Sequence, residues 1–269
     1  MRFLLPHLFR LATVNNDDLI SLKRLLAEAE NCVASYLERT AGLSHATKGI
    51  RRSEMFFLYA AIAHLEPKRI LESGRARAQS TLVLSSLFPQ ATIVSIESEA
   101  NSPDVAVAAA RLKNRTNIEC LFGDSRLLLP KLLREGDIIL IDGPKDFRAL
   151  KLALRLLRTG KPHAVWVHDL WFGLPARRFV DCHLRKAFLS DNPEFVRRYA
   201  RLDSSNVPLA LSSGPVRRAY GATLACFPAG SENYALLLAK LSLAQGLERV
   251  RETMRKILRR PARERPKDD

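Results

Sequence analysis

The sequence predicts an α/β fold with a doubly wound, mostly parallel sheet of seven strands. Two observations predict it. Five apolar segments between residues 69 and 169 show little polar alternation, and a helical segment separates each from the next. Strands buried on both faces have this composition, and helical crossovers connect parallel neighbours. Further along, two apolar segments follow one another without a helix, which predicts an antiparallel hairpin at the end of the sheet.

The elements of the parallel part follow in order. The predicted strands are 69–73, 91–97, 118–122, 137–142 and 164–169. The helices between them are 78–88, 103–114, 126–134 and 147–158. Ser102 before Pro103 is typical of a helix start, and Gly160 is typical of a helix end. Right-handed crossovers then place helices on both faces of the sheet.

Two helices precede the sheet. Apolar residues recur at helical spacing over 16–39, with Asn16 or Asp17 as the capping residue. The segment 53–65 is apolar nearly all round and ends at Glu66-Pro67, so we expect a buried helix there. These helices form an N-terminal extension over 1–50 and the start of the main domain over 51–230.

The last third departs from the alternation. We expect a helix over 176–188, then strands over 195–203 and 220–229 that form the hairpin. A final long helix over 232–259 belongs to a C-terminal unit, 231–269, with a basic tail.

Composition excludes several classes of protein. With 269 residues, 47% hydrophobic and 26% charged, the chain is typical of globular proteins. Its four cysteines are far apart and have no metal-ligand spacing, which indicates reduced thiols and a cytoplasmic location. No apolar run is long enough to span a membrane. Weak contact of the N-terminal segment with a membrane surface remains open.

The chain is strongly basic. Its formal net charge is +15, and residues 249–269 hold nine Lys or Arg against four acids. Such a surplus attracts nucleic acid, anionic lipid or acidic substrates. No basic motif with interleaved aromatic residues is present, so a nucleic-acid partner is not expected, and a solvated arginine-rich face is the simpler interpretation.

An acidic residue lies at the carboxyl end of each of the five parallel strands. Ligands of doubly wound sheets bind beyond these ends. A single acid at a strand end could simply cap the following helix, and this alternative suits Asp124, at the end of the third strand, best. Five such acids in succession instead predict a binding crevice. The five are Glu72, Glu97, Asp124, Asp142 and Asp169.

These residues resemble the class I S-adenosylmethionine-dependent methyltransferases over about residues 54–228. The motif of that family stands here as Glu72-x-Gly74-x-Ala76-x-Ala78, followed by Gln79-Ser80-Thr81, in a form similar to small-molecule O-methyltransferases. Alanine resists positive φ, so we expect the turn at Gly74 alone, with smallness sufficient at the later positions. The resemblance implies S-adenosylmethionine as cofactor, held by Glu72, Ser73, Gly74, Ala76, Ser80, Glu97, Asp124, Ser125 and Asp142.

The resemblance also assigns roles within this set. Glu72 and the Gly74 turn would face the methionine portion of the cofactor. Glu97 would accept hydrogen bonds from the ribose hydroxyls, because a carboxylate can take both. Asp124, with Ser125 beside it, would contact the adenine amino group.

The fourth strand end, Asp142-Gly143-Pro144-Lys145, resembles the catechol-type O-methyltransferases. In that subgroup the acid binds a divalent metal and the lysine assists deprotonation, so Asp142 and Lys145 are the expected catalytic residues. Asp142 and Asp169 would be ligands of Mg²⁺, although Leu170 stands where the subgroup has a polar ligand. His168 is interpreted as a hydrogen-bonded core residue.

The function implied is S-adenosylmethionine-dependent methyl transfer to a hydroxyl of a small molecule, such as a sugar or secondary metabolite. Two alternatives stay open: a non-catalytic binding or assembly protein with this fold, and an RNA methyltransferase. A homodimer formed through the N-terminal amphipathic helix is also open.

Overall fold

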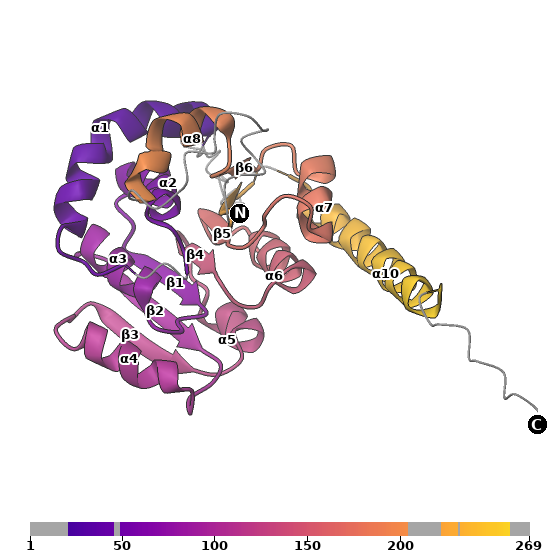
Figure 1. Ribbon diagram of the computed structural model, residues 1–269, viewed down its shortest axis with the longest axis horizontal. Helices are drawn as coiled ribbons and strands as arrows, with labels where there is room; N and C mark the ends of the chain where they lie inside the picture. Colours follow the sequence, from indigo (N-terminus) through magenta and orange to yellow (C-terminus); the bar gives the residue numbers. More distant parts are fainter. Residues whose placement is uncertain (1–20, 46–48, 204–221, 231, 259–269) are drawn as a thin grey trace, which may run out of the picture.

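The structure is a computed structural model that describes residues 21–45, 49–203, 222–230 and 232–258. Its centre is one seven-stranded sheet in the order β3-β2-β1-β4-β5-β7-β6 (Figure 1). Neighbours among the first five pair in parallel, whereas β7 pairs antiparallel with both β5 and β6. The strands are β1 (Arg69–Ser73), β2 (Thr92–Glu97), β3 (Ile118–Phe122), β4 (Ile138–Ile141), β5 (Ala164–Val167), β6 (Phe188–Leu189) and β7 (Ala225–Pro228). The predicted fold class is confirmed.

A helix follows each parallel strand, as the apolar pattern predicts. These helices are α3 (Gln79–Leu87), α4 (Pro103–Leu112), α5 (Ser125–Leu132), α6 (Phe147–Leu157) and α7 (Pro175–His183). The expected cap is present, since the Ser102 side chain accepts a hydrogen bond from the Asp104 N–H. The helix predicted over 176–188 is shorter than expected and ends at His183.

Alternate residues of the central strands enter two separate cores. Ile70 and Ile138 pack in the core beneath the N-terminal helices, whereas their neighbours Leu71 and Ile139 pack on the opposite face. The first core includes residues of α1 (Leu22–Thr40), α2 (Arg52–Ile62) and α8 (Pro193–Tyr199), and the second includes residues of α6, α7 and α10 (Tyr234–Leu258). Because both faces are covered, these strands need no polar side, which explains their unbroken apolar sequence.

The first two helices differ from expectation only at their ends. Helix α1 begins at Leu22, and Ser21 caps it by accepting a hydrogen bond from the Arg24 N–H. The predicted caps, Asn16 and Asp17, lie outside the described residues. Helix α2 is buried from its second residue to its last, as predicted, and continues into a short 3-10 turn, η2 (Ala63–Leu65).

The predicted strand over 195–203 is wrong, because the segment forms α8 and a 3-10 turn, η3 (Ala200–Asp203). The Asn192 side chain accepts hydrogen bonds from the N–H groups of Glu194 and Phe195, which starts a helix. Phe195 and Tyr199, four residues apart, then bury one helical face. The antiparallel partner of β7 is the two-residue β6 instead. Of the second predicted strand, 220–229, the described part, 222–229, is a strand only over Ala225–Pro228.

A buried arginine joins α7 to the segment before α8. The Arg177 side chain is fully buried, and its two terminal nitrogens lie 2.8 and 3.2 Å from the two carboxylate oxygens of Asp191. One of them also donates to the Leu170 carbonyl, while Nε bonds to Asp181. Asp191 is itself buried, but Asp181 is 35% exposed.

Among the described residues, no helix is long and apolar enough to cross a lipid bilayer.

Replacing the two acids separately tests how much each pair contributes. Asp191→Ala leaves a buried guanidinium without its two-point partner, so we expect the free energy of unfolding to fall by about 3 kcal/mol. Asp181→Ala removes a partly solvated contact to the same arginine and should cost less than about 1 kcal/mol. Urea denaturation followed by circular dichroism measures both, and equal losses would contradict this account.

Candidate functional site

The loops that follow β1 and β4 touch at the carboxyl edge of the sheet. The backbone N–H groups of Asp142 and Gly143 both donate to the Ser73 carbonyl, at 2.8 and 3.0 Å. Gly74 has φ +90°, and a Cβ there would lie 2.7 Å from the Gly143 nitrogen. Position 74 therefore requires glycine for two reasons, its backbone conformation and this close approach. The Ser73 hydroxyl also donates to the Gly143 carbonyl.

The expectation of a single turn at Gly74 is wrong. Ala76 and Ala78 also have positive φ, 42° and 59°. The Ala76 N–H donates to the Glu97 carboxylate at 2.7 Å, and the Ala78 N–H donates to the Arg75 carbonyl at 2.7 Å. These bonds hold a tight loop, and each left-handed alanine costs about 1–2 kcal/mol. Such strain is most often found at functional sites.

The Arg75 side chain packs against β2 and β3. It is almost fully buried and turns back over the sheet, where it donates to the Ser95 carbonyl at 2.7 Å. Its guanidinium carbon lies 4.9 Å from the centre of the Phe122 ring, a distance typical of a cation–π contact. Arg77 points elsewhere and pairs with Asp104 at 3.5 Å on the surface.

Glu97 lies beside the loop as an ionised carboxylate. One of its oxygens accepts the Ala76 N–H, and the other accepts the N–H groups of Ser98 and Glu99, at 2.7 and 3.2 Å. Burial acts to raise its pKa, but these hydrogen bonds outweigh burial and lower it. A carboxylate held in this way keeps free lone pairs for a ligand hydroxyl.

Glu72 is placed beneath the loop rather than at its open side. Its side chain is fully buried, and it accepts hydrogen bonds from Thr81 at 2.5 Å and Ser95 at 2.6 Å. Burial raises its pKa, although the hydroxyl groups around it, Ser80 included, act in the opposite direction. Glu72 thus connects β1, β2 and α3 beneath the loop, and its expected contact with the cofactor stays a prediction.

Asp124 has the capping role that the sequence left open. It precedes α5 and accepts a hydrogen bond from the Arg126 N–H at 2.9 Å. The Arg126 guanidinium lies 2.6 Å from its second oxygen, and the hydrogen bonds from Arg126 lower the pKa of Asp124. Ser125 is buried, and its hydroxyl lies 3.4 Å from the Gly143 carbonyl.

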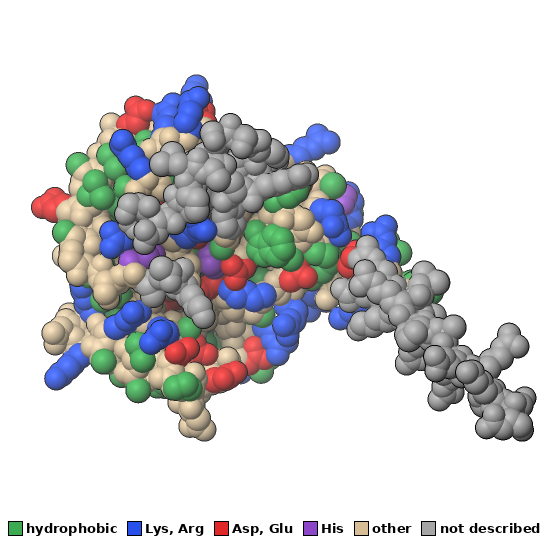
Figure 2. Space-filling view, in the orientation of Figure 1, with side chains coloured by type: hydrophobic (Ala, Val, Ile, Leu, Met, Phe, Trp, Pro, Cys, Tyr) green, Lys and Arg blue, Asp and Glu red, His purple; other side chains and the backbone are tan. Residues whose placement is uncertain are grey.

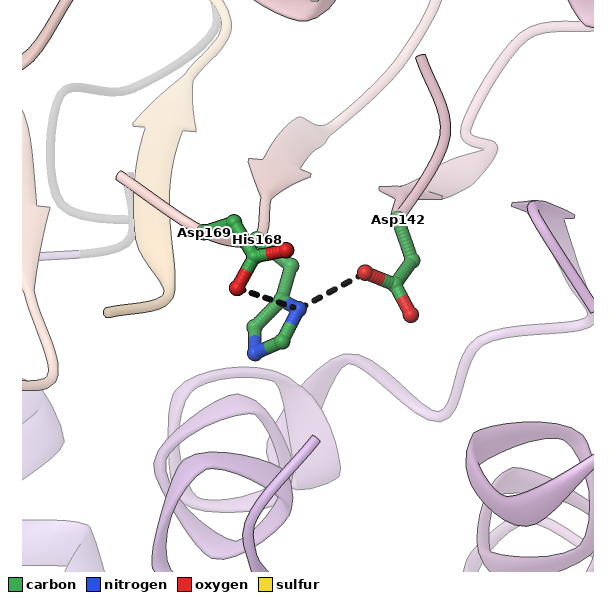
Figure 3. A group of neighbouring side chains, drawn as sticks. All are labelled: Asp142, His168 and Asp169. Carbon is green, nitrogen blue, oxygen red and sulfur yellow. Dashed lines mark hydrogen bonds and ion pairs between the residues drawn. The ribbon is translucent and has the colours of Figure 1, made fainter. Parts of the chain in front are cut away.

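Acidic side chains after β4 and β5 converge, as their strand positions predict (Figure 3). β4 and β5 are paired neighbours, with Ile141 opposite Val167. The Lys145 ammonium lies between the two carboxylates, 2.5 Å from Asp142 and 2.6 Å from Asp169. Asp169 has φ +60°, a strained conformation for an aspartate at the edge of a site.

His168 lies within this cluster. Its Nδ1 lies 2.7 Å from an Asp142 oxygen and 3.6 Å from an Asp169 oxygen, as Figure 3 shows. Its Nε2 lies 3.2 Å from Glu54 of α2. The interpretation of His168 as a buried, hydrogen-bonded residue agrees with the structure, but its partners are the acids of the site.

Glu54 is the residue that sequence reasoning missed. It is fully buried, and the oxygen that contacts His168 also accepts the Arg51 N–H at 2.8 Å. Its signal in the sequence is an acid in the first turn of α2, directly before the apolar run MFFLYAAI. A buried acid of this kind needs a partner, which the sequence alone does not identify.

The charges of this cluster reinforce one another. Burial lowers the pKa of His168, but Glu54 and Asp142 outweigh burial and raise it to about 10. Burial acts to raise the pKa of Asp142, whereas His168 and Lys145 lower it. Burial likewise acts to lower the pKa of Lys145, but the two carboxylates raise it. Lys145 is therefore an ammonium ion here, so another group must act as the base in the deprotonation that it is expected to assist.

Comparisons with known proteins find similar solved structures only. The O-methyltransferase TomG from Streptomyces achromogenes, in complex with SAM, is 21% identical over 73% of this chain and 89% of its own, with a TM-score of 0.43. The O-methyltransferase from Bacillus cereus with SAH is 16% identical over 75% and 90%, with a TM-score of 0.42. The SAH-bound Podospora anserina methyltransferase PaMTH1 is 14% identical over 85% and 99%, also with a TM-score of 0.42.

No protein-family model and no curated protein sequence matches the chain. The sheet continues for two strands on one side of β1 and for four on the other, and β7 lies antiparallel between β5 and β6. The fold of this chain is a mostly parallel, doubly wound α/β sheet that ends in antiparallel strands. All three structural similarities fall below 25% identity and a TM-score of 0.5, so the geometry of the site must support any function.

The charge of His168 has a measurable consequence. Its pKa of about 10 in the folded state exceeds the ordinary value of about 6.5, so His168 stabilises the fold fully below about pH 6.5 and less as pH rises towards 10. The free energy of unfolding of the wild type should therefore fall towards that of His168→Gln between pH 7 and 10. Chemical denaturation across this range measures it, with the exposed His183→Gln as control. Parallel profiles for wild type and His168→Gln would show that the imidazole is neutral.

Proposed function

We propose that this chain is an S-adenosylmethionine-dependent methyltransferase that transfers the methyl group to a hydroxyl of a small molecule. One observation carries the proposal: the Lys145 ammonium, fixed between two carboxylates, lies at the same edge of the sheet as Glu97 and the tight loop at 74–78. A cofactor loop and a charged group for the acceptor are thus next to one another, at the position where ligands of this kind of sheet bind.

The residues of the loop fit the cofactor. Gly74 has no side chain to block the approach of a ligand, and Ala76 is exposed beside the Glu97 carboxylate. The Gly74–Ala76 loop would hold the methionine portion, Glu97 the ribose hydroxyls, and the segment at Asp124 and Ser125 the adenine. When bound, the cofactor supplies an electrophilic methyl group on its sulfonium. The solved TomG and Bacillus cereus enzymes were crystallised with SAM and SAH, respectively.

The chain's own residues would prepare the acceptor oxygen. Asp169 is 34% exposed, so its carboxylate is open to accept a hydrogen bond from an incoming hydroxyl. Lys145, 47% exposed and held 2.6 Å from Asp169, would donate to the same hydroxyl oxygen. As the proton passes to the carboxylate, the ammonium stabilises the negative charge that develops on the oxygen. His168 and Glu54 would keep Asp142 in position and ionised.

The residues do not fit the expected Mg²⁺. The two carboxylates share the Lys145 ammonium, which lies where a divalent cation would bind. His168 is charged at neutral pH, and an imidazolium offers no lone pair to a metal. Leu170, at the position of the third ligand, is apolar and fully buried. Although Asp142, His168 and Asp169 lie close enough together to form a metal site, their charge state favours the bound lysine.

The proposed cofactor site is tested at Glu97. Glu97→Gln keeps the size of the side chain but removes the charge, so we expect S-adenosylhomocysteine to bind at least about tenfold more weakly, as loss of a charge-assisted hydrogen bond costs about 1.5–3 kcal/mol. Isothermal titration calorimetry measures the affinity. Glu99→Gln, two residues away and exposed, is the matched control and should bind normally. Absence of binding by the wild type would favour the non-catalytic alternative, and unchanged binding by a folded Glu97→Gln would place the ribose elsewhere.

The role of Lys145 is tested by methyl transfer to a panel of phenols, catechols and sugars. Lys145→Ala should lower turnover by about 100-fold, the contribution of a positioned proton-transfer or charged group, while cofactor affinity changes little. Wild-type activity should persist in EDTA, because the ammonium takes the place of the metal. The control is Lys131→Ala, an exposed lysine of α5. Full activity of Lys145→Ala would show that Lys145 has no part in the mechanism. Loss of wild-type activity in EDTA would show that the reaction requires a divalent metal.

A further inference from the structure

Helix α10 carries apolar side chains on two separate faces. Its inner face includes Tyr234, Leu237 and Leu241, which are buried in the second core, and the helix contacts α6 and α7. Five large apolar side chains elsewhere on the same helix are between 51 and 67% exposed: Leu236, Leu243, Leu247, Val250 and Met254. The proposed active site uses none of them.

These five side chains form one continuous surface, which we call the α10 stripe. Their spacings of seven, four, three and four residues keep them within an arc of about 60° on a regular helix, and the stripe is about 27 Å long. Its centre lies about 140° around the helix axis from the inner face. The stripe can therefore contact a flat partner while the inner face stays packed. Figure 1 shows that the far part of α10 extends away from the sheet, beyond α7.

Positive charge accompanies the stripe. Lys240 lies four residues after Leu236, and Arg251 directly follows Val250. Both are exposed at the edge of the stripe, where long basic side chains can reach past the apolar surface. The one described acid of this part of the helix, Glu248, is only 12% exposed and is engaged by Arg178 and Arg251, at 3.7 and 3.5 Å. Residues 249–269, which include Arg251, hold nine Lys or Arg against four acids in the sequence. Lys and Arg side chains also lie at several places on the face of the molecule that Figure 2 shows.

We propose that the α10 stripe binds the surface of an anionic lipid bilayer, with α10 lying in the plane of the interface. A helix with an apolar face bordered by Lys and Arg binds in this way, because the apolar side chains enter the headgroup boundary and the cations contact lipid phosphates. Charge complementarity decides among partners. A second copy of this chain would bring a like-charged helix and a body of net charge +15 against this surface, and nucleic acid would leave the leucines exposed.

The test uses the full chain and unilamellar vesicles, either of phosphatidylcholine alone or mixed with phosphatidylglycerol. We expect co-sedimentation with the anionic vesicles and at least about tenfold weaker binding to phosphatidylcholine. The variant Leu243→Gln with Leu247→Gln keeps helix propensity but removes the centre of the stripe, and should lower binding to the anionic vesicles by about tenfold or more. The matched control is Leu37→Gln with Leu127→Gln, two leucines that are 50 and 63% exposed on α1 and α5.

A second variant, Lys240→Glu with Arg251→Glu, should weaken the same binding and reduce its dependence on salt. Three outcomes would overturn the proposal. The wild type does not bind anionic vesicles at low salt. The Leu243→Gln and Leu247→Gln variant binds them as the wild type does, so that charge alone is responsible. Sedimentation equilibrium without lipid shows a dimer that this variant abolishes, in which case the partner of the stripe is a second copy.

Discussion

The ion pair between Glu54 and His168 is the contact on which the rest of the site depends. Burial of Glu54 in an apolar helix raises its pKa, and His168, 3.2 Å away, acts against burial and favours the carboxylate. This contact joins helix α2 to the residue that follows β5. The same imidazole holds Asp142 through its other nitrogen, and Asp142 in turn holds Lys145. One chain of opposite charges thus connects the N-terminal helical layer to the exposed ammonium.

Backbone strain gathers at the same edge of the sheet. Of the five described non-glycine residues with positive φ, Ala76, Ala78, Asp146 and Asp169 lie in loops that follow β1, β4 and β5. Hydrogen bonds stabilise these conformations: Ala76 through Glu97, and Asp146 through its acceptance of the Ala176 N–H at 3.2 Å. A site that is strained but held on several sides is organised before its ligands arrive, which suits a transfer reaction that depends mainly on alignment.

The two proposals concern different layers of the molecule. The charged site is connected to the core that contains α1, α2 and α8, whereas α10 packs on the opposite face with α6 and α7. A bilayer bound along α10 would therefore not compete with the helix that carries Glu54. Since the inner residues Leu237 and Leu241 stay buried in this arrangement, lipid binding requires no rearrangement of the core.

The sequence by itself determined the five parallel strands, most helices and the convergence of Asp142 and Asp169, because apolar runs reveal buried strands and paired parallel strands end at the same edge. It misassigned 195–203, because its apolar residues suit a strand or a helix and the cap at Asn192 decides between them. Only the tertiary structure revealed Glu54, which lies 114 residues from His168 in the chain. It also decided the left-handed backbone of Ala76, held by Glu97, and the charge of Lys145, since both depend on side chains from other strands. The local apolar pattern specifies helices and strands, whereas the pKa values of the site and its strained loops depend on contacts between residues that are distant in the sequence.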